Sequence, residues 1–196
     1  MGAKRKTVAR QNSKSNYNNV VDIKPFQKPS KQVNILPRNR NQETYVLALL
    51  DETKDIIFGI GPAGTGKTLL AVQVAVKMFK EGAVDKIIVT RPAVSVDEDL
   101  GFLPGTLEEK MAPWTRPIFD VFREHFYANE IESMIKEGVI EISPLAYMRG
   151  RTFKDAYIIA DEMQNATPNQ MKMLLTRIGD NSKMVVTGDL APVSYT

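Results

Sequence analysis

The sequence predicts an α/β fold in which a parallel β-sheet is covered by helices on both faces. Short apolar runs suited to buried strands alternate with longer helical stretches, which is the pattern of parallel sheets built from β-α-β units. A glycine-rich loop stands between one of these strands and the helix that follows it. The 196 residues of the chain are enough for one full core of this kind.

The glycine-rich loop, residues 61–68, reads GPAGTGKT and fits the pattern G-x-x-x-x-G-K-[ST]. The apolar run 55–60 before it predicts a buried strand, and residues 69–79 after it, which lack Gly and Pro, predict a helix. Glycines let successive backbone N–H groups face an anion at a helix N-terminus, where the helix dipole favours negative charge. A chance glycine-rich turn is the alternative, but both flanking segments disfavour it.

This loop is expected to bind a nucleoside triphosphate, with ATP and Mg²⁺ as the implied ligands. Lys67 is expected to reach the β- and γ-phosphates, and Thr68 to place its hydroxyl on Mg²⁺. The cradle is expected to be formed by Gly61, Pro62, Ala63, Gly64, Thr65, Gly66, Lys67 and Thr68.

A second candidate site motif is the apolar run 157–160, which is followed by Asp161 and Glu162. The pattern predicts a buried central strand whose carboxyl end opens into the crevice where such sheets bind ligands. Asp161 is then expected on the Mg²⁺ side, and Glu162 is placed to polarise the attacking water. A surface pair at the end of an ordinary strand is the alternative from these residues alone.

A third apolar run, residues 183–187, ends in Thr187 and is followed by Gly188 and Asp189. A strand between the phosphate loop and the Asp161 strand could bring a hydroxyl to the γ-phosphate or to the attacking water. Thr187 is the candidate for this sensor role and Asp189 the second choice. A strand followed by a Gly-Asp turn explains the same residues equally well.

These motifs together resemble the PhoH-like family of P-loop ATPases over most of the chain. The matching stretches are FGIGPAGTGKT at 58–68, IIVTRPAV at 87–94, LGFLPG at 100–105, EK at 109–110, ISPLAYMRGRT at 142–152, DEMQNATPNQMKMLLTRIG at 161–179 and SKMVVTGD at 182–189. So many ordered matches are far more specific than a phosphate loop alone. The resemblance implies a RecA-like P-loop NTPase fold and a helicase-related ATPase, often linked to RNA metabolism and carried by phages as an accessory gene.

In helicase-like ATPases a glutamine upstream of the phosphate loop reads the adenine edge, and the resemblance places Gln42 where the counterpart in this family would stand. An amide can donate to and accept from adenine at once, as its bidentate contacts with adenine in DNA illustrate. Tyr45 could stack on the base or flank it. The alternative is a polar helix start before the apolar residues 46–50.

Arg149 and Arg151 are the candidates for contacting the γ-phosphate of a neighbouring subunit, with Arg177 as runner-up. Helicases close the site with an arginine from a second lobe, and a protein with one core would obtain it by forming a homo-oligomeric ring, as the resemblance to hexameric relatives also implies. Each arginine could equally well pair with an acid of its own chain.

Charge divides the chain into a basic arm and an acidic body. Residues 1–40 hold ten Lys and Arg against one Asp, whereas residues 41–196 hold sixteen against twenty-two acids. Residues 1–35 are poor in large apolar side chains, so we expect a disordered N-terminal arm that contacts RNA or single-stranded DNA phosphates. A solvated tail without a partner is the alternative.

Residues 36–196 are expected to form the ATPase domain, without its last strand. After the Thr-Gly-Asp motif at residues 187–189, the family usually continues with a glutamine, a further helix and a strand. Here only residues 190–196 follow. A chain shortened in this way could bind nucleotide without turning it over.

Composition narrows the remaining function classes. The chain has no cysteine, which excludes a disulfide framework and fits a reducing cytoplasm, that of the host if the gene is phage-encoded. No apolar run approaches the roughly 20 residues that span a bilayer. From the motifs, ATP hydrolysis is the leading prediction. A non-hydrolysing RNA-binding accessory protein and a small-molecule kinase are the alternatives.

Overall fold

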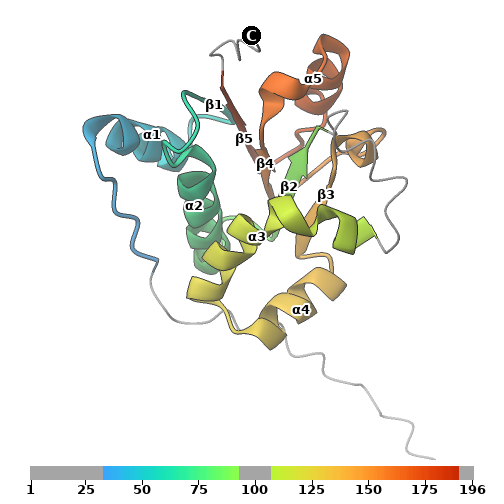
Figure 1. Ribbon diagram of the computed structural model, residues 1–196, viewed down its shortest axis with the longest axis horizontal. Coiled ribbons are helices and arrows are strands. Elements are labelled where there is room, and N and C mark those ends of the chain that lie inside the picture. The colour runs from blue at the N-terminus through green and yellow to red at the C-terminus, as the bar shows by residue number, and fades with distance from the viewer. Residues whose placement is uncertain (1–32, 93–106, 190–196) are drawn as a thin grey trace, which may run out of the picture.

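Five parallel strands form one sheet in the computed structural model, which describes residues 33–92 and 107–189 (Figure 1). The spatial order of the strands is β1-β5-β4-β2-β3. In chain order the elements are α1 (Arg40–Leu50), β1 (Ile56–Ile60), α2 (Lys67–Glu81), β2 (Lys86–Arg91), α3 (Leu107–His125), α4 (Ala128–Lys136), β3 (Ile140–Pro144), the 3₁₀ turn η2 (Leu145–Met148), β4 (Ala156–Ala160), the 3₁₀ turn η3 (Met163–Asn165), α5 (Pro168–Leu175) and β5 (Lys183–Gly188).

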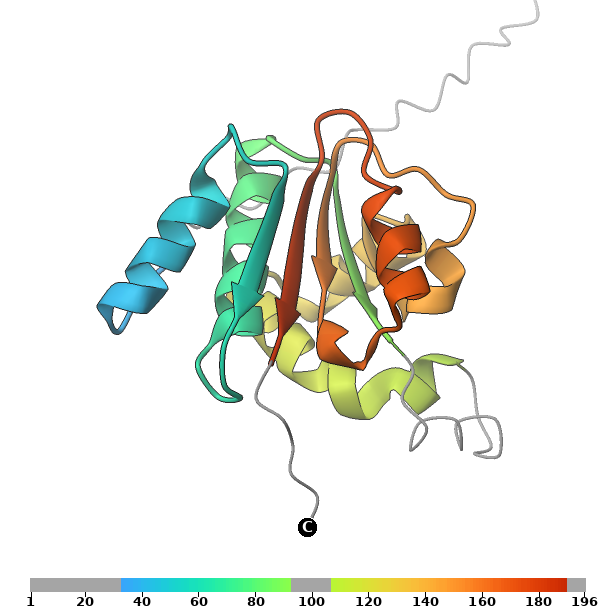
Figure 2. The ribbon, with the colours of Figure 1, turned by 90° about the horizontal axis from the view of Figure 1, so that it is seen from above.

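Helices cover both faces of this sheet, which confirms the predicted α/β class. On one face α1, α2, α3 and α4 share an apolar cluster with all five strands, and on the other face α5 and η2 pack against β2, β4 and β5 (Figure 2). Helix α2 packs closely against the sheet, and seven of its fifteen residues are buried. It ends at Gly82, whose φ of 76° allows the left-handed cap.

The centre of the sheet is formed by β4 and β5, in which every residue is buried. Both segments read as near-continuous apolar runs, as strands buried on both faces of a parallel sheet do. The prediction of a buried central strand at residues 157–160 is therefore confirmed, and residues 183–187 form a strand as predicted. Strand β5 lies between β1 and β4, which is the position that the sensor hypothesis requires.

Strand β1 differs from its prediction because it lies at the edge of the sheet. Ile56, Phe58 and Ile60 are 36%, 53% and 47% exposed, and only the alternate residues of the strand are buried. The strand expected to be buried is therefore buried on one face only. The register pairs Phe58 with Val186, so the exposed residues lie on the α5 side, where the buried cluster holds no residue of β1.

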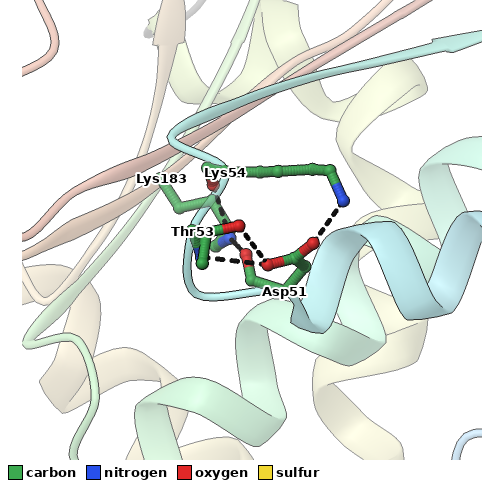
Figure 3. A network of polar contacts seen from close by, with 4 residues as sticks. All are labelled: Asp51, Thr53, Lys54 and Lys183. Carbon is green, nitrogen blue, oxygen red and sulfur yellow. Dashed lines mark hydrogen bonds and ion pairs between the residues drawn. The ribbon is translucent and has the colours of Figure 1, made fainter.

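The end of β1 opposite the glycine-rich loop is tied to β5 by a network of polar contacts (Figure 3). The Lys183 ammonium, on a residue only 5% exposed, donates to the carbonyls of Asp51 and Lys54 at 2.7 Å each. Burial lowers the pKa of Lys183. The carboxylate of Asp51 accepts from the Thr53 hydroxyl at 2.6 Å and from Lys54. The network aligns the starts of β1 and β5, and with them the strand ends at which the site forms.

The folded body already includes residues near position 33, since Val33 and Ile35 pack against the core. The remainder of the basic arm, residues 93–106 and the segment after Asp189 lie outside the described residues. Within the part of the chain that the structure describes, no helix is long and apolar enough to cross a membrane.

Candidate nucleotide-binding site

The phosphate loop connects β1 to α2 and lies at the carboxyl ends of the parallel strands. Gly64 and Gly66 have φ of 74° and 85°, a left-handed conformation that glycine adopts without strain. Gly66 is the N-cap of α2, so the first backbone N–H groups of that helix lie directly after the loop. Such free N–H groups, together with the helix dipole, form an anion-binding site.

Lys67 folds back over this loop. Its ammonium donates to the carbonyls of Gly61 and Pro62 at 2.6 and 2.7 Å. The Thr65 hydroxyl also donates to the Pro62 carbonyl, at 2.8 Å. The lysine therefore lies within the concave side of the loop, held by acceptors that a phosphate oxygen can replace.

Asp161 connects the phosphate loop with the two central strands. Its Oδ1 atom accepts one hydrogen bond from the Thr68 hydroxyl and one from the Thr187 hydroxyl, each 2.6 Å long. Asp161 and Thr187 are 7% and 1% exposed, so water competes little for these contacts. Three residues that the sequence singled out separately thus converge at one carboxylate oxygen.

The same residues fit a magnesium ion by their chemistry. Mg²⁺ prefers oxygen ligands, keeps several waters, and is commonly held by one or two protein groups together with substrate phosphates. Thr68 and Asp161 supply a hydroxyl and a carboxylate, and no described residue hydrogen-bonds to Oδ2 of Asp161. The described residues contain no group of three or more acidic or histidine side chains placed to hold a metal alone.

Glu162 follows Asp161 in an unusual backbone conformation. Its φ of 53° and ψ of 38° are left-handed, which is uncommon for a residue with a side chain, and it begins the turn η3. Its Oε2 accepts from the Gln164 side-chain amide at 2.5 Å. This hydrogen bond holds the Glu162 carboxylate near the carboxyl end of β4, one residue after Asp161.

Gln42 of α1 braces the phosphate loop. Its side-chain N–H donates to the Thr65 carbonyl at 3.0 Å, and its carbonyl oxygen accepts from the Arg38 backbone N–H at 2.7 Å. The amide also limits the space beside Gly66, where a Cβ would lie 3.1 Å from the Gln42 nitrogen. The structure therefore gives Gln42 a contact with the loop that its sequence position alone did not predict.

A cavity of about 410 Å³ opens between α1, β1 and the phosphate loop. Gln42, Tyr45, Phe58 and Lys67 are among the residues that line it. The Tyr45 ring packs under Gly59, where a Cβ would come within 2.9 Å of three of its atoms, and burial raises the pKa of its hydroxyl. Tyr45 therefore forms part of the cavity wall, with its ring fixed by β1.

Arg149 and Arg151 follow η2 near β3, at the opposite edge of the sheet from β1, and Arg177 lies beside Arg151. Arg151 pairs with Glu141 at two contacts, one of them 2.6 Å, and its guanidinium lies 4.7 Å from the centre of the Phe153 ring. Arg177 donates to the Arg151 carbonyl at 3.2 Å. Arg149 is exposed and has no ion pair or side-chain hydrogen bond with the described residues. Of the three, only Arg149 has a side chain without such a partner.

Comparison with known proteins identifies the family of this chain. The profile of the family described as PhoH-like protein matches residues 34–195. This chain belongs to the PhoH-like family. Its five-stranded parallel sheet and glycine-rich loop are those of a P-loop NTPase, as the resemblance implied.

Individual relatives are similar over most of this chain. The PhoH-like protein of Bacillus subtilis (strain 168) is 52% identical over 166 residues, which are 85% of this chain and 51% of the relative. The PhoH-like protein of Mycobacterium tuberculosis (strain H37Rv) is 52% identical over 81% of this chain and 45% of its own. Protein PhoH of Escherichia coli (strain K12) is 48% identical over 80% and 44%. The chain thus spans about half the length of the PhoH-like relatives that it matches.

Sequence reasoning missed two contacts of this site. One is the brace from Gln42 to Thr65, which joins residues 23 positions apart. The other is Gln164, which contacts both Glu162 and the backbone after β5. The position of Gln164, two residues after Glu162, could have suggested its contact with that carboxylate. Its contact with the Asp189 N–H depends on where β5 lies in the sheet.

Proposed function

We propose that this protein binds ATP with Mg²⁺ and hydrolyses it to ADP and phosphate. The observation that carries the proposal is the single Asp161 oxygen that accepts from both Thr68 and Thr187, directly beside the phosphate loop. A carboxylate in this position can hold the water shell of a magnesium ion, while Thr68 can bind the ion directly. If Asp161 were only a surface acid at the end of an ordinary strand, the hydroxyls of Thr68 and Thr187 would have no reason to meet at its carboxylate.

Each residue of the site has a distinct task in this proposal. Lys67 exchanges the carbonyls of Gly61 and Pro62 for β- and γ-phosphate oxygens, and it neutralises the charge that develops there. The bound Mg²⁺ would polarise the phosphoryl group. Glu162 accepts a proton from the attacking water at its carboxylate, and Thr187 donates to the γ-phosphate or orients that water.

The adenine base is assigned to the cavity between α1 and β1. A volume of about 410 Å³ lies within the range of about 300–1,000 Å³ typical of small-molecule sites, and the cavity is continuous with the phosphate loop. Gln42 can bind the adenine edge with the amide hydrogen and lone pair that Thr65 and Arg38 leave free. Bracing the loop is its second role.

A nucleic acid is the proposed macromolecular partner, bound through the basic arm. Residues 1–32 hold eight Lys and Arg against one Asp. Contacts between such a segment and RNA or single-stranded DNA release counterions, so the binding weakens as salt rises. Deleting residues 1–32 leaves Val33 and Ile35 in the core and is expected to lower RNA affinity and flatten its salt dependence. Equal affinity and equal slope in a filter-binding titration would contradict this role.

A homo-oligomeric ring would complete the active site. Arg149 is exposed at the β3 edge, and the phosphate loop follows β1 at the opposite edge. A head-to-tail interface brings two different edges of neighbouring copies together. Arg149 of one copy can then reach the γ-phosphate of the next, whereas Arg151 is already paired with Glu141.

Phosphate release by the purified protein tests the proposed function. We expect Mg²⁺-dependent release from ATP, with a further increase when RNA or single-stranded DNA is added. The variant Lys67→Ala is expected to lose triphosphate binding, because only backbone donors then face the β- and γ-phosphates. Tight ATP binding without phosphate release would instead indicate a non-hydrolysing accessory protein.

A further inference from the structure

One peptide unit at the end of β5 joins the phosphate loop to the turn that carries Glu162. Its carbonyl, on Gly188, accepts from the backbone N–H of Gly61 at 3.1 Å. Its N–H, on Asp189, donates to the side-chain oxygen of Gln164 at 3.1 Å. Because the carbonyl and the N–H of a trans peptide point in opposite directions, this unit spans the gap between the loop and η3.

Gln164 continues this connection to the candidate base. Its amide nitrogen donates to Oε2 of Glu162 at 2.5 Å, while its oxygen is occupied by the Asp189 N–H. The two partners fix the orientation of the amide, since its nitrogen is the end that can donate to the carboxylate and its oxygen is the end that can accept from the backbone N–H. A hydrogen bond to a carboxylate is also among the stronger kinds.

The close approach of β5 to η3 depends on Gly188. A Cβ at this position would lie 3.2 Å from the side-chain oxygen of Gln164 and 3.4 Å from its backbone nitrogen. The base itself sits on a left-handed residue, at which side-chain direction depends on how the turn is held. Gln164 is the side chain that links this turn to the strand end.

We propose that Gln164 is a positioning residue that sets the location of the Glu162 carboxylate relative to the phosphate loop. The connection runs from Gly61 through the 188–189 peptide and the Gln164 amide to Glu162. It couples the first residue of the loop to the group that activates water. This inference rests on the proposed hydrolysis of ATP and adds to it a residue that touches neither the phosphates nor the metal.

The geometry also explains why an amide is needed at this position. Gln164→Glu keeps the length of the side chain and an oxygen for the Asp189 N–H, but it places a second carboxylate against Glu162. Gln164→Ala removes both contacts. Asn165, on the same turn, is exposed and its side chain makes no hydrogen bond or ion pair with the described residues, so Asn165→Ala is the matched control.

Steady-state phosphate release and the affinity for a fluorescent ATP analogue test the proposal in these variants. Misplacing a reacting group by about 1 Å can cost about a hundredfold in rate. We expect kcat to fall about tenfold to a hundredfold in Gln164→Ala and at least as far in Gln164→Glu, with the affinity for the analogue within about twofold of the parent. Asn165→Ala is expected to keep the parent kcat.

A double variant separates positioning from a general loss of structure. If Gln164 acts through Glu162, adding Gln164→Ala to Glu162→Gln lowers the residual rate no further, because the group to be positioned is already gone. A hydrolysing parent whose Gln164→Ala variant keeps its kcat, or a further tenfold fall in the double variant, would overturn the inference while leaving the proposed function intact. A parent that binds ATP without hydrolysing it would overturn both.

Discussion

Asp161 is the residue on which the candidate site depends most. Its Oδ1 atom receives the hydroxyls of Thr68 and Thr187, which come from the start of α2 and the end of β5. The local motifs singled out the loop and the acid as separate features of the chain. Their meeting at one oxygen, and the second partner of Gln164, depend on strand order, which no local pattern contains.

At the scale of elements, β3 and the segment after η2 are joined by an ion pair. The hydrogen bond from Arg151 lowers the pKa of Glu141 below its ordinary value of 4.5, although burial acts in the opposite direction. The pair is partly exposed, with 40% of the arginine and 29% of the glutamate side chain open to solvent. Solvent therefore screens part of the interaction.

This pair predicts a particular loss of stability in acid. A carboxylate whose pKa is lower in the folded state stabilises the fold above its unfolded pKa, and this contribution disappears as the pH falls through the folded value. Urea denaturation is expected to show the parent's unfolding free energy falling more steeply than that of Glu141→Gln between about pH 5 and about pH 3. Glu132→Gln, an exposed change on α4, should follow the parent. Parallel curves for the parent and Glu141→Gln would contradict the pairing.

Much of the element order was predictable, because buried parallel strands and amphipathic helices have distinct periodicities. The strands β4 and β5 were predicted from their apolar runs, IIA before Asp161 and MVV before Thr187. The exposure of β1 was not, since Phe58 and Val186 are both apolar and only the position of β1 at the edge distinguishes them. Edge and centre are properties of the assembled sheet rather than of one strand.

For the whole molecule, the position of Arg149 predicts shared active sites. Mixing Lys67→Ala subunits, which keep Arg149, with Arg149→Ala subunits, which keep the phosphate loop, is expected to restore phosphate release that neither protein has alone. An arginine at the γ-phosphate is worth about 10³ to 10⁵ in rate, so a few restored sites should be detectable.

The control for this experiment is Arg123→Ala, which removes an exposed arginine that pairs with Asp120 on α3. It is expected to hydrolyse ATP as the parent does, alone and in mixtures. A parent that remains monomeric with ATP at every concentration tested, yet hydrolyses it rapidly, would contradict the shared site. Native mass spectrometry on the same samples reports the number of subunits.

The central claim is that Glu162 activates water for the hydrolysis of ATP held by the phosphate loop. The most direct test compares Glu162→Gln with the parent, measuring the affinity for a fluorescent ATP analogue and single-turnover phosphate release in the same buffer. The account predicts unchanged affinity and a fall in rate of about 10² to 10⁴, the usual contribution of a general base. Release at the parent rate with unchanged affinity would contradict it.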